Sequence, residues 1–298
     1  MAYTLIGKDF TPPDVHGKVT GKAKYAEDFK VEGMLYARLL TSPIPHARIV
    51  RLDVSKALQM EGVVAVLTAD DVPEMPNLGN PILTNEPAYV GDPILAVAAV
   101  DEQTAEDAIE AIDFIFEPLP FVVDPLKSLQ PGGPHARIQG NVGNSTMREE
   151  FRSIHWTDDE FASLANNQLP QGEAAREWTV GDLEAGFDQA DYILDESFVT
   201  ASYSHNSMEP RSAMAYWENG KCFLYGSSQS QSFPVPGLAA YIGIEPENLV
   251  FVAEFCGGGF GSKGGPYPTM TIPAHLSRLT GRPVMLRISR EEEYYIGS

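Results

Sequence analysis

The chain has 298 residues, of which 43% are hydrophobic and 10% aromatic, so it can bury the core of one large domain or two ordinary ones. Its formal net charge of −20, from 41 acidic and 21 basic residues, argues against nucleic acid and acidic membrane surfaces as partners. The two cysteines form no CxxC pair, which argues against an iron–sulfur cluster or structural zinc on this chain. Without a secretory signal or an apolar run of about 18 residues, we expect a cytoplasmic protein with no membrane span.

The first 129 residues alternate short strand patterns with helix patterns. Alternating or continuous apolar runs predict strands in 33–42, 47–54, 62–73, 93–101 and 113–120. Ser55 is the predicted cap of a short helix that ends at Gln59, and Ala105 and Ala108 recur at helical spacing after the fourth strand. This mixed order predicts an α+β domain over residues 1–129.

Residues 130–179 are turn-rich and polar, and we expect a linker or surface insertion with one short helix near 158–166. A second strand–helix series begins at residue 180 and continues to residue 298. Strands are predicted at 221–226, 249–254 and 283–289, and helices near 233–241 and 269–280. Gly281 is expected to end the last helix.

Neither cysteine is expected to act in catalysis. Cys222 lies in an apolar strand pattern and is placed in the core, and Cys256, just before three consecutive glycines, is given a buried role. The tail SREEEYYIGS, from Ser289, carries a charge run that we expect to be solvated or to form an interface with another chain.

The glycine-rich run is FCGGGFGSKGGPYP, from Phe255 to Pro268, and its six glycines leave too little side-chain volume to fill a core. A Walker-type phosphate loop requires GxxxxGK[ST], and this register fails because Lys263 is followed by Gly264. The dinucleotide fingerprint GxGxxG does occur at 259–264, yet GGPYP interrupts the place where a helix should begin. A backbone nest for an anionic group and a tight structural turn are the other two interpretations.

The neighbourhood of this run resembles the large molybdopterin-binding subunit of the xanthine dehydrogenase/aldehyde oxidase family of molybdenum hydroxylases. The resemblance is carried by SSQSQSFP, from Ser227, and by YIGIEPENLVFVAEFCGGGFGSK, with Phe260 lying 31 positions after Gln229. The segments GKVTGKAKYAEDF, LLTSPIPHARI, GVVAVLTADDVP and YVGDPILAVAAVDEQTAEDAIEAI resemble the family's small hammerhead-like α+β domain. The resemblance therefore implies a hammerhead-like domain at 1–129 and the first part of a molybdopterin-binding α+β domain at 180–298.

The resemblance also implies roles for individual residues. Gln229 matches the glutamine beside the molybdenum, which orients the site through a hydrogen bond and is a catalytic candidate. Gly258, Gly259, Phe260 and Gly261 match the loop that holds the cofactor, and the Phe260 ring matches the one that borders the substrate. The implied reaction is hydroxylation of an electron-poor carbon, with oxygen derived from water.

The segment SHNSMEPRSAMAYWENG, from Ser204, resembles the family's segment near the substrate pocket. It makes His205, Glu209 and Arg211 pocket candidates beside Phe260 and Gly264, although a satisfied strand-and-turn cluster explains the segment as well. Purine-oxidising members carry a glutamate where this chain has Gly264, which argues against xanthine and for an N-heteroaromatic or aldehyde-type substrate.

The resemblance implies a molybdenum–molybdopterin cofactor, in its cytosine dinucleotide form, and partner subunits that carry [2Fe-2S] and FAD. Nothing in this chain matches the family's general-base glutamate, which implies a site that is incomplete on this chain alone. Either the subunit is split and a C-terminal companion chain carries the glutamate, or this chain is a fragment of the subunit. Two alternatives stay open: an NAD-dependent dehydrogenase that uses the GxGxxG at 259–264, and a non-catalytic binding or scaffold module.

Overall fold

The computed structural model describes residues 4–73, 81–124, 157–162, 177–194 and 204–296, together with the single residues 127, 134, 196, 198 and 200. The chain divides into two compact units. The first holds Met1–Ile44, Arg48–Glu117 and Tyr203–Ser298, and the second holds Pro45–Ala47 and Pro118–Ser202.

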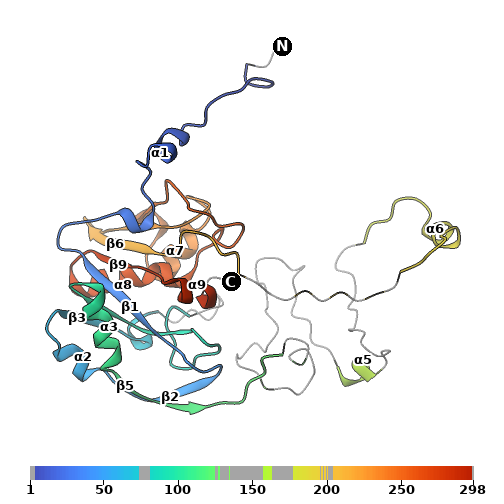
Figure 1. Ribbon diagram of the computed structural model, residues 1–298. Coiled ribbons are helices and arrows are strands. Elements are labelled where there is room, and N and C mark those ends of the chain that lie inside the picture. Colours follow the sequence, from blue (N-terminus) through green and yellow to red (C-terminus); the bar gives the residue numbers. More distant parts are fainter. Residues whose placement is uncertain are drawn as a thin grey trace. The chain divides into compact units, whose positions relative to one another are not determined.

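The first unit is built on a seven-stranded mixed sheet (Figure 1). Its strands are β1 (Leu35–Thr41), β3 (Val63–Leu67), β4 (Pro93–Ala99), β6 (Ala213–Glu218), β7 (Lys221–Gly226), β8 (Leu249–Val252) and β9 (Val284–Leu286). They lie in the order β3-β4-β1-β9-β6-β7-β8. β1 and β9 are parallel, as are β7 and β8, and the other neighbours are antiparallel. A separate two-stranded sheet joins β2 (Ala47–Asp53) to β5 (Asp113–Pro118).

The helices are short. The α-helices are α1 (Val15–Val19), α2 (Ser55–Gln59), α3 (Glu102–Glu110), α5 (Asp158–Ala162), α6 (Leu183–Asp188), α7 (Val235–Ile242), α8 (Ile272–Thr280) and α9 (Arg290–Ile296). Single 3-10 turns occur at Ala26–Asp28, Ala69–Asp71, Pro246–Asn248 and Pro268–Thr271. Gly281 ends α8 in a left-handed conformation with φ of 66°, as its position in the sequence predicts.

Helices cover both faces of the sheet, which explains why every residue of β4 is buried. Val97 belongs to the core that contains Ala105 of α3. Ala96 and Ala98, which alternate with it along the strand, belong to the core on the other face, together with Leu276 of α8. The continuous apolar run in β4 is therefore the pattern of a strand with two buried faces.

The expected α+β fold is confirmed, and β1, β4 and β7 lie where the apolar patterns predict strands. Cys222 of β7 is buried in the core, as expected. The predicted cap of α2 is wrong: Ser55 is the first helical residue, and Val54 holds the cap position. The carboxylate of Asp53 accepts the Ser55 N–H at 3.0 Å, so the side chain that closes this turn lies two residues earlier than predicted.

The predicted segments 1–129 and 180–298 both contribute strands to the large sheet, because β9 lies between β1 and β6. The boundaries of the three predicted segments stay a prediction. Most of the predicted linker at 130–179 lies outside the described residues, and the helix expected near 158–166 is seen there as α5.

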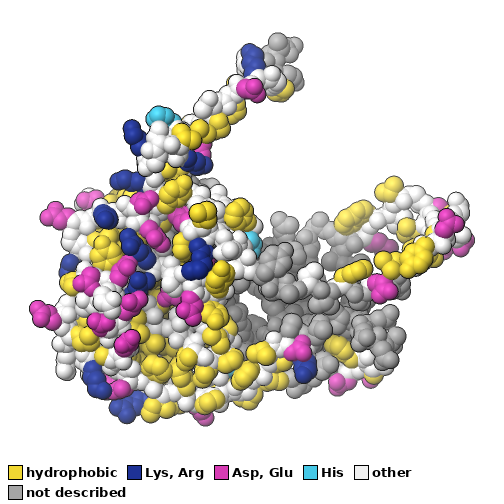
Figure 2. Space-filling view, viewed as in Figure 1, with side chains coloured by type: hydrophobic (Ala, Val, Ile, Leu, Met, Phe, Trp, Pro, Cys, Tyr) yellow, Lys and Arg dark blue, Asp and Glu magenta, His cyan; other side chains and the backbone are white. Residues whose placement is uncertain are grey.

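The surface of the first unit carries mixed charge on the face shown in Figure 2, where acidic and basic side chains are interspersed. In the second unit, the described residues of 177–198 expose eight large apolar side chains: Trp178, Val180, Leu183, Phe187, Tyr192, Ile193, Leu194 and Phe198. Within the described parts of the chain, every helix is too short or too polar to cross a bilayer.

His275 of α8 is buried at 6% exposure, and its Nε2–H donates to the backbone oxygen of Tyr241 at 3.1 Å. Burial lowers the pKa of His275 to about 4 from its ordinary 6.5, against the opposing effect of that hydrogen bond. Folding therefore favours the neutral ring. Its contribution to stability is complete above pH 6.5 and is lost as the pH falls toward 4, which amounts to about 3 kcal/mol.

The unfolding free energy of the wild type falls between pH 6.5 and 4, and we predict that this fall is about 3 kcal/mol smaller in His275→Gln. The reason is that the glutamine amide can still donate to Tyr241 but does not titrate. Urea unfolding at several pH values measures this. His205 is exposed, so His205→Gln should keep the wild-type profile. A wild-type profile for the His275 variant would contradict the prediction.

Candidate functional site

Four connections meet at one end of the large sheet. β7 and β8 run parallel, so the loops that follow them leave from the same end. β6 is antiparallel to β7 and to β9, and Ala213 at its start lies opposite Gly226 of β7 and Leu286 of β9. The segment before β6, the loops after β7 and β8, and α9 after β9 are therefore brought together. This topology collects residues 204–212, 227–234, 253–267 and 287–296.

Gln229, in the loop after β7, is bonded directly to the glycine-rich loop after β8. Its side-chain Oε1 accepts the backbone N–H groups of Gly261 at 2.9 Å and Lys263 at 3.3 Å. Its own backbone N–H donates to the Lys263 oxygen at 3.0 Å. The amide nitrogen of the Gln229 side chain has no acceptor among the described residues. Gln229 is exposed, so this nitrogen is available as a donor.

The glycine loop requires glycine at several positions for steric reasons. A Cβ on Gly259 would lie 2.4 Å from Oε1 of Gln229, and a Cβ on Gly257 would lie 2.5 Å from the Cβ of Glu209. Gly258 and Gly261 have φ of 104° and 105°, in the region that side chains rarely adopt. The absence of side chains at these glycines therefore lets the loop backbone pass close to Gln229 and Glu209.

The loop leaves three consecutive backbone donors unpaired. The N–H groups of Gly258, Gly259 and Phe260 meet no acceptor within the described parts of the chain. Phe260 itself is left-handed, with φ of 52°, and its ring is 72% exposed. Consecutive free N–H groups in such a turn form a nest that can bind an anionic oxygen.

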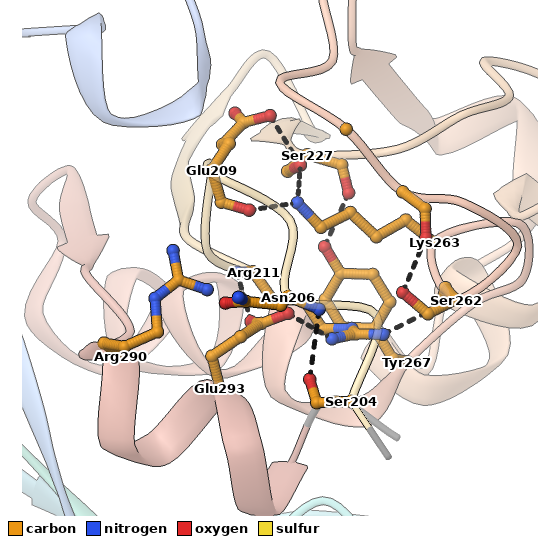
Figure 3. A network of polar contacts seen from close by, with 12 residues as sticks. Ser204, Asn206, Glu209, Arg211, Ser227, Ser262, Lys263, Tyr267, Arg290 and Glu293 are labelled. Atoms are coloured by element: carbon orange, nitrogen blue, oxygen red, sulfur yellow. Dashed lines mark hydrogen bonds and ion pairs between the residues drawn. The ribbon is translucent and has the colours of Figure 1, made fainter.

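A buried polar network lies beneath the loop (Figure 3). Lys263 is 0% exposed, and its Nζ donates to the backbone oxygen of Glu209 and, at 2.8 Å, to Oγ of Ser227. The Ser227 hydroxyl donates to Oε2 of Glu209 at 2.8 Å, and the Gly257 N–H donates to the same oxygen at 2.6 Å. Burial lowers the pKa of Lys263, and the Glu209 carboxylate opposes that shift.

A second buried pair joins α9 to the loop. Arg211 is bonded to Glu293 at 2.5 Å, and its other terminal nitrogen donates to the Ser262 backbone oxygen at 2.8 Å. The Arg211 guanidinium also lies 5.3 Å from the centre of the Tyr267 ring. The prediction that the tail is solvated is therefore wrong for Glu293, which is 2% exposed, although Glu291 and Tyr294 of the same helix are exposed.

The structure thus brings all the predicted site residues to one end of the sheet, but at different depths. His205 is exposed, and its Nε2 lies 3.9 Å from the place of a Cβ on Gly261. Glu209 and Arg211 are buried, and the bonds described above satisfy them within the protein. Gly264 has room for a side chain, since a Cβ there would meet only the Gly261 oxygen at 3.5 Å. Contact of these four residues with substrate stays a prediction.

The residues that hold the loop through buried hydrogen bonds are not predicted by any pattern in the sequence. Lys263 is considered in the sequence only for a phosphate loop, whose register fails, and neither Ser227 nor Glu293 is predicted to belong to the site. A lysine inside a run of glycines looks exposed, and nothing in the pattern SREEEYY separates the buried glutamate from its neighbours.

The geometry does not fit the dinucleotide fingerprint. That fingerprint requires a helix that begins at the third glycine and points its N–H groups at a pyrophosphate. Here α8 begins at Ile272, eight residues after Gly264, and a 3-10 turn at Pro268–Thr271 precedes it. The described residues also contain no group of three or more His, Cys, Asp or Glu side chains that could hold a metal ion by themselves.

We predict that Glu293→Ala destabilises the chain by about 3–5 kcal/mol, because it leaves the Arg211 charge buried without its partner. Urea unfolding at neutral pH measures the change. Glu291→Ala, on the same helix but exposed, should stay within about 0.5 kcal/mol of the wild type. Equal losses of unfolding free energy in the two variants would contradict the prediction that the buried ion pair is needed for stability.

Two family descriptions match the chain. Residues 20–120 match the aldehyde oxidase and xanthine dehydrogenase a/b hammerhead domain. Residues 165–298 match the molybdopterin cofactor-binding domain. The second range contains Gln229 and the whole glycine loop.

Individual relatives agree with these matches. The chain is 32% identical over 292 residues to a probable xanthine dehydrogenase subunit of Bacillus subtilis (strain 168), and the match covers 96% of this chain and 35% of that protein. It is 28% identical over 307 residues to the nicotinate dehydrogenase large molybdopterin subunit of Eubacterium barkeri, and that match covers 99% of this chain and 64% of the relative.

Among solved structures, quinoline 2-oxidoreductase from Pseudomonas putida 86 superposes with a TM-score of 0.74 at 25% identity, over 96% of this chain and 35% of that chain. The chain thus spans about a third of the length of two of these relatives and under two thirds of the other. The two domain matches and the relatives that span both show that the chain belongs to the xanthine dehydrogenase/aldehyde oxidase family and corresponds to part of its large molybdopterin-binding subunit.

Proposed function

We propose that the chain forms part of the cofactor and substrate site of a molybdenum hydroxylase, which oxidises an N-heteroaromatic or aldehyde-type substrate with oxygen derived from water. The observation that carries the proposal is the join between Gln229 and the glycine loop. The Gln229 carbonyl holds two loop N–H groups, and its amide nitrogen stays free beside three further unpaired N–H groups. This arrangement leaves several hydrogen-bond donors free on one loop and its neighbour, without a side chain that could itself perform a two-electron oxidation.

The residues fit a molybdenum–molybdopterin cofactor. A cofactor rich in oxygen and sulfur acceptors needs donors, and the loop offers the N–H groups of Gly258, Gly259 and Phe260. A flat, bulky group also needs a backbone that it can approach closely, which glycine permits. When bound, the cofactor supplies the redox chemistry, and the protein holds and orients it. We assign its cytosine dinucleotide form as part of the same proposal.

Gln229 acts as a hydrogen-bond donor in this site. Its Oε1 is already occupied by the Gly261 and Lys263 N–H groups, so the side chain can present only its amide N–H groups to a ligand. The ligand atom beside Gln229 must therefore be an acceptor. Because the carbonyl end is fixed at two points, the donor end has a defined direction, and it can orient the bound group.

Phe260 supplies the surface for the substrate. Its ring is 72% exposed, and the left-handed backbone at this residue fixes where the ring leaves the loop. An exposed aromatic ring stacks on a flat aromatic molecule or packs against an apolar one. The names of the relatives support this substrate class, because nicotinate and quinoline are both N-heteroaromatic compounds.

The chain does not provide a general base among the carboxylates beneath the loop. Glu209 accepts hydrogen bonds from the Ala26 N–H at 3.2 Å, the Gly257 N–H at 2.6 Å and the Ser227 hydroxyl at 2.8 Å. Glu209 is buried, and the protein already occupies three of the about four acceptor positions of its carboxylate, so we do not give it the role of general base. We assign the general base to the part of the large subunit that this chain does not span, either on a C-terminal companion chain or in the same polypeptide, since the chain covers 35% of its Bacillus relative.

The two electrons of the oxidation must leave through other chains. Cys222 is buried in β7, and Cys256 lies beside the glycine loop, so the two cysteines cannot ligate an iron–sulfur cluster together. We propose [2Fe-2S] and flavin partner subunits as the route. The names of several relatives, which describe subunits of larger complexes, support an assembly of this kind.

Cofactor analysis of the complex that co-purifies with the chain tests the proposal. We expect about one molybdenum and one pterin dinucleotide for each copy of the chain. A complex that contains neither would favour a non-catalytic binding or scaffold module, and bound NAD in their place would favour a nicotinamide enzyme.

We predict that Gln229→Ala lowers turnover by about 10- to 100-fold, because it removes the donor that orients the cofactor and releases the Gly261 and Lys263 N–H groups. Steady-state kinetics on the assembled complex measures the loss, and size-exclusion chromatography should show intact assembly. Gln231→Ala is the matched control, since that side chain bonds the Ala253 oxygen at 3.2 Å. Unchanged turnover in the Gln229 variant would remove this residue from the site.

A further inference from the structure

Ser207 carries a hydroxyl that is buried and unsatisfied. The residue is 1% exposed, and its Oγ has no hydrogen-bond partner within the described parts of the chain. A buried hydroxyl without a partner loses its hydration and gains nothing in return, so each such group requires a reason. The position of Ser207 gives one.

Ser207 packs against the glycine loop at the point where the unpaired N–H groups begin. Its Cβ lies 3.5 Å from the place of a Cβ on Gly258. The Phe260 ring lies against the same glycine, 3.1 Å from that place. Two other buried hydroxyls among the described residues also lack partners, but Thr269 and Ser277 lie on the 3-10 turn before α8 and on α8 itself. Of the three, Ser207 is the one that lies against Gly258, where the unpaired N–H groups begin.

The local backbone prevents Ser207 from finding a partner within the protein. Asn206, just before it, is left-handed with φ of 49°, and its N–H donates to the Ser204 hydroxyl at 3.2 Å. The Asn206 side chain accepts the Tyr294 hydroxyl at 3.2 Å, and the Glu209 N–H donates to the Gly257 oxygen at 3.3 Å. Hydrogen bonds therefore hold Asn206 before Ser207 and Glu209 after it, and they keep the Ser207 side chain beside the glycine loop.

We infer that the Ser207 hydroxyl is a further cofactor-binding group, which hydrogen-bonds an acceptor atom of the molybdenum–molybdopterin cofactor where that cofactor lies against Gly258. This inference rests on the proposed function. The free N–H groups of Gly258 and Gly259 and the Ser207 hydroxyl would then meet one ligand from two sides. Access requires the Phe260 ring to leave Gly258, and a ring that is 72% exposed loses little packing when it moves.

The test measures cofactor retention in the assembled complex. Molybdenum and pterin contents of wild type, Ser207→Ala and Ser277→Ala are followed over time after transfer into cofactor-free buffer. We expect Ser207→Ala to release molybdenum and pterin about 10- to 100-fold faster than the wild type, because one hydrogen bond to a charged group is lost. Ser277→Ala removes an equally buried and equally unpaired hydroxyl on α8 and should release at the wild-type rate.

A second measurement separates binding from structure. In the cofactor-free complex, both variants should unfold at a temperature no lower than the wild type, because each removes an unsatisfied buried hydroxyl. A lower unfolding temperature for Ser207→Ala, a wild-type release rate, or a raised KM with full cofactor retention would each overturn the inference. Wild-type complex without molybdenum would instead overturn the proposed function itself.

Discussion

The buried ammonium group of Lys263 is the constraint on which the rest of the site depends. A lysine that is 0% exposed must have its donors satisfied, and here they reach the Glu209 backbone and the Ser227 hydroxyl. These two partners lie on the segments before β6 and after β7, so one side chain ties three connections together. The backbone of the same lysine is bonded to Gln229 in both directions. The burial of the Lys263 side chain therefore determines both the position of Gln229 and the course of the loop.

Some polar groups of the site have hydrogen-bond partners within the protein, and others have none among the described residues. Beneath the loop, Glu209 and Arg211 have hydrogen bonds from side chains and backbone groups, and neither needs a ligand. Above it, the Gly258 and Gly259 N–H groups, the Gln229 amide and the Ser207 hydroxyl have no partner among the described residues. Backbone donors that are held in a fixed turn and left unpaired suit a preorganised site, because the loop backbone need not rearrange when the ligand arrives and only the exposed Phe260 ring moves. The buried charges supply the rigidity, and the glycines supply the close approach.

The sequence predicts the parts of this arrangement that have a local pattern. The continuous apolar run of β4 and the glycine that ends α8 are both read from neighbouring residues. The closeness of Gln229 to the loop follows from the family resemblance, not from spacing alone. The buried pair of Arg211 and Glu293 joins residues 82 positions apart, and no periodicity could select it from a run of three glutamates. Ser207 is likewise an ordinary serine in the sequence, and only its burial beside the loop distinguishes it.

The order of the strands places both matched segments in one sheet. β9 lies between β1 and β6, so Leu35 pairs with Val284 and the two segments share one sheet. The site uses this arrangement directly, because the Ala26 N–H donates to the Glu209 carboxylate at 3.2 Å from within the hammerhead match. The Ser212 hydroxyl, just before β6, donates to Glu27 at 2.5 Å. The carboxylate beneath the glycine loop is thus held by both matched domains, and the site belongs to the sheet that they build together.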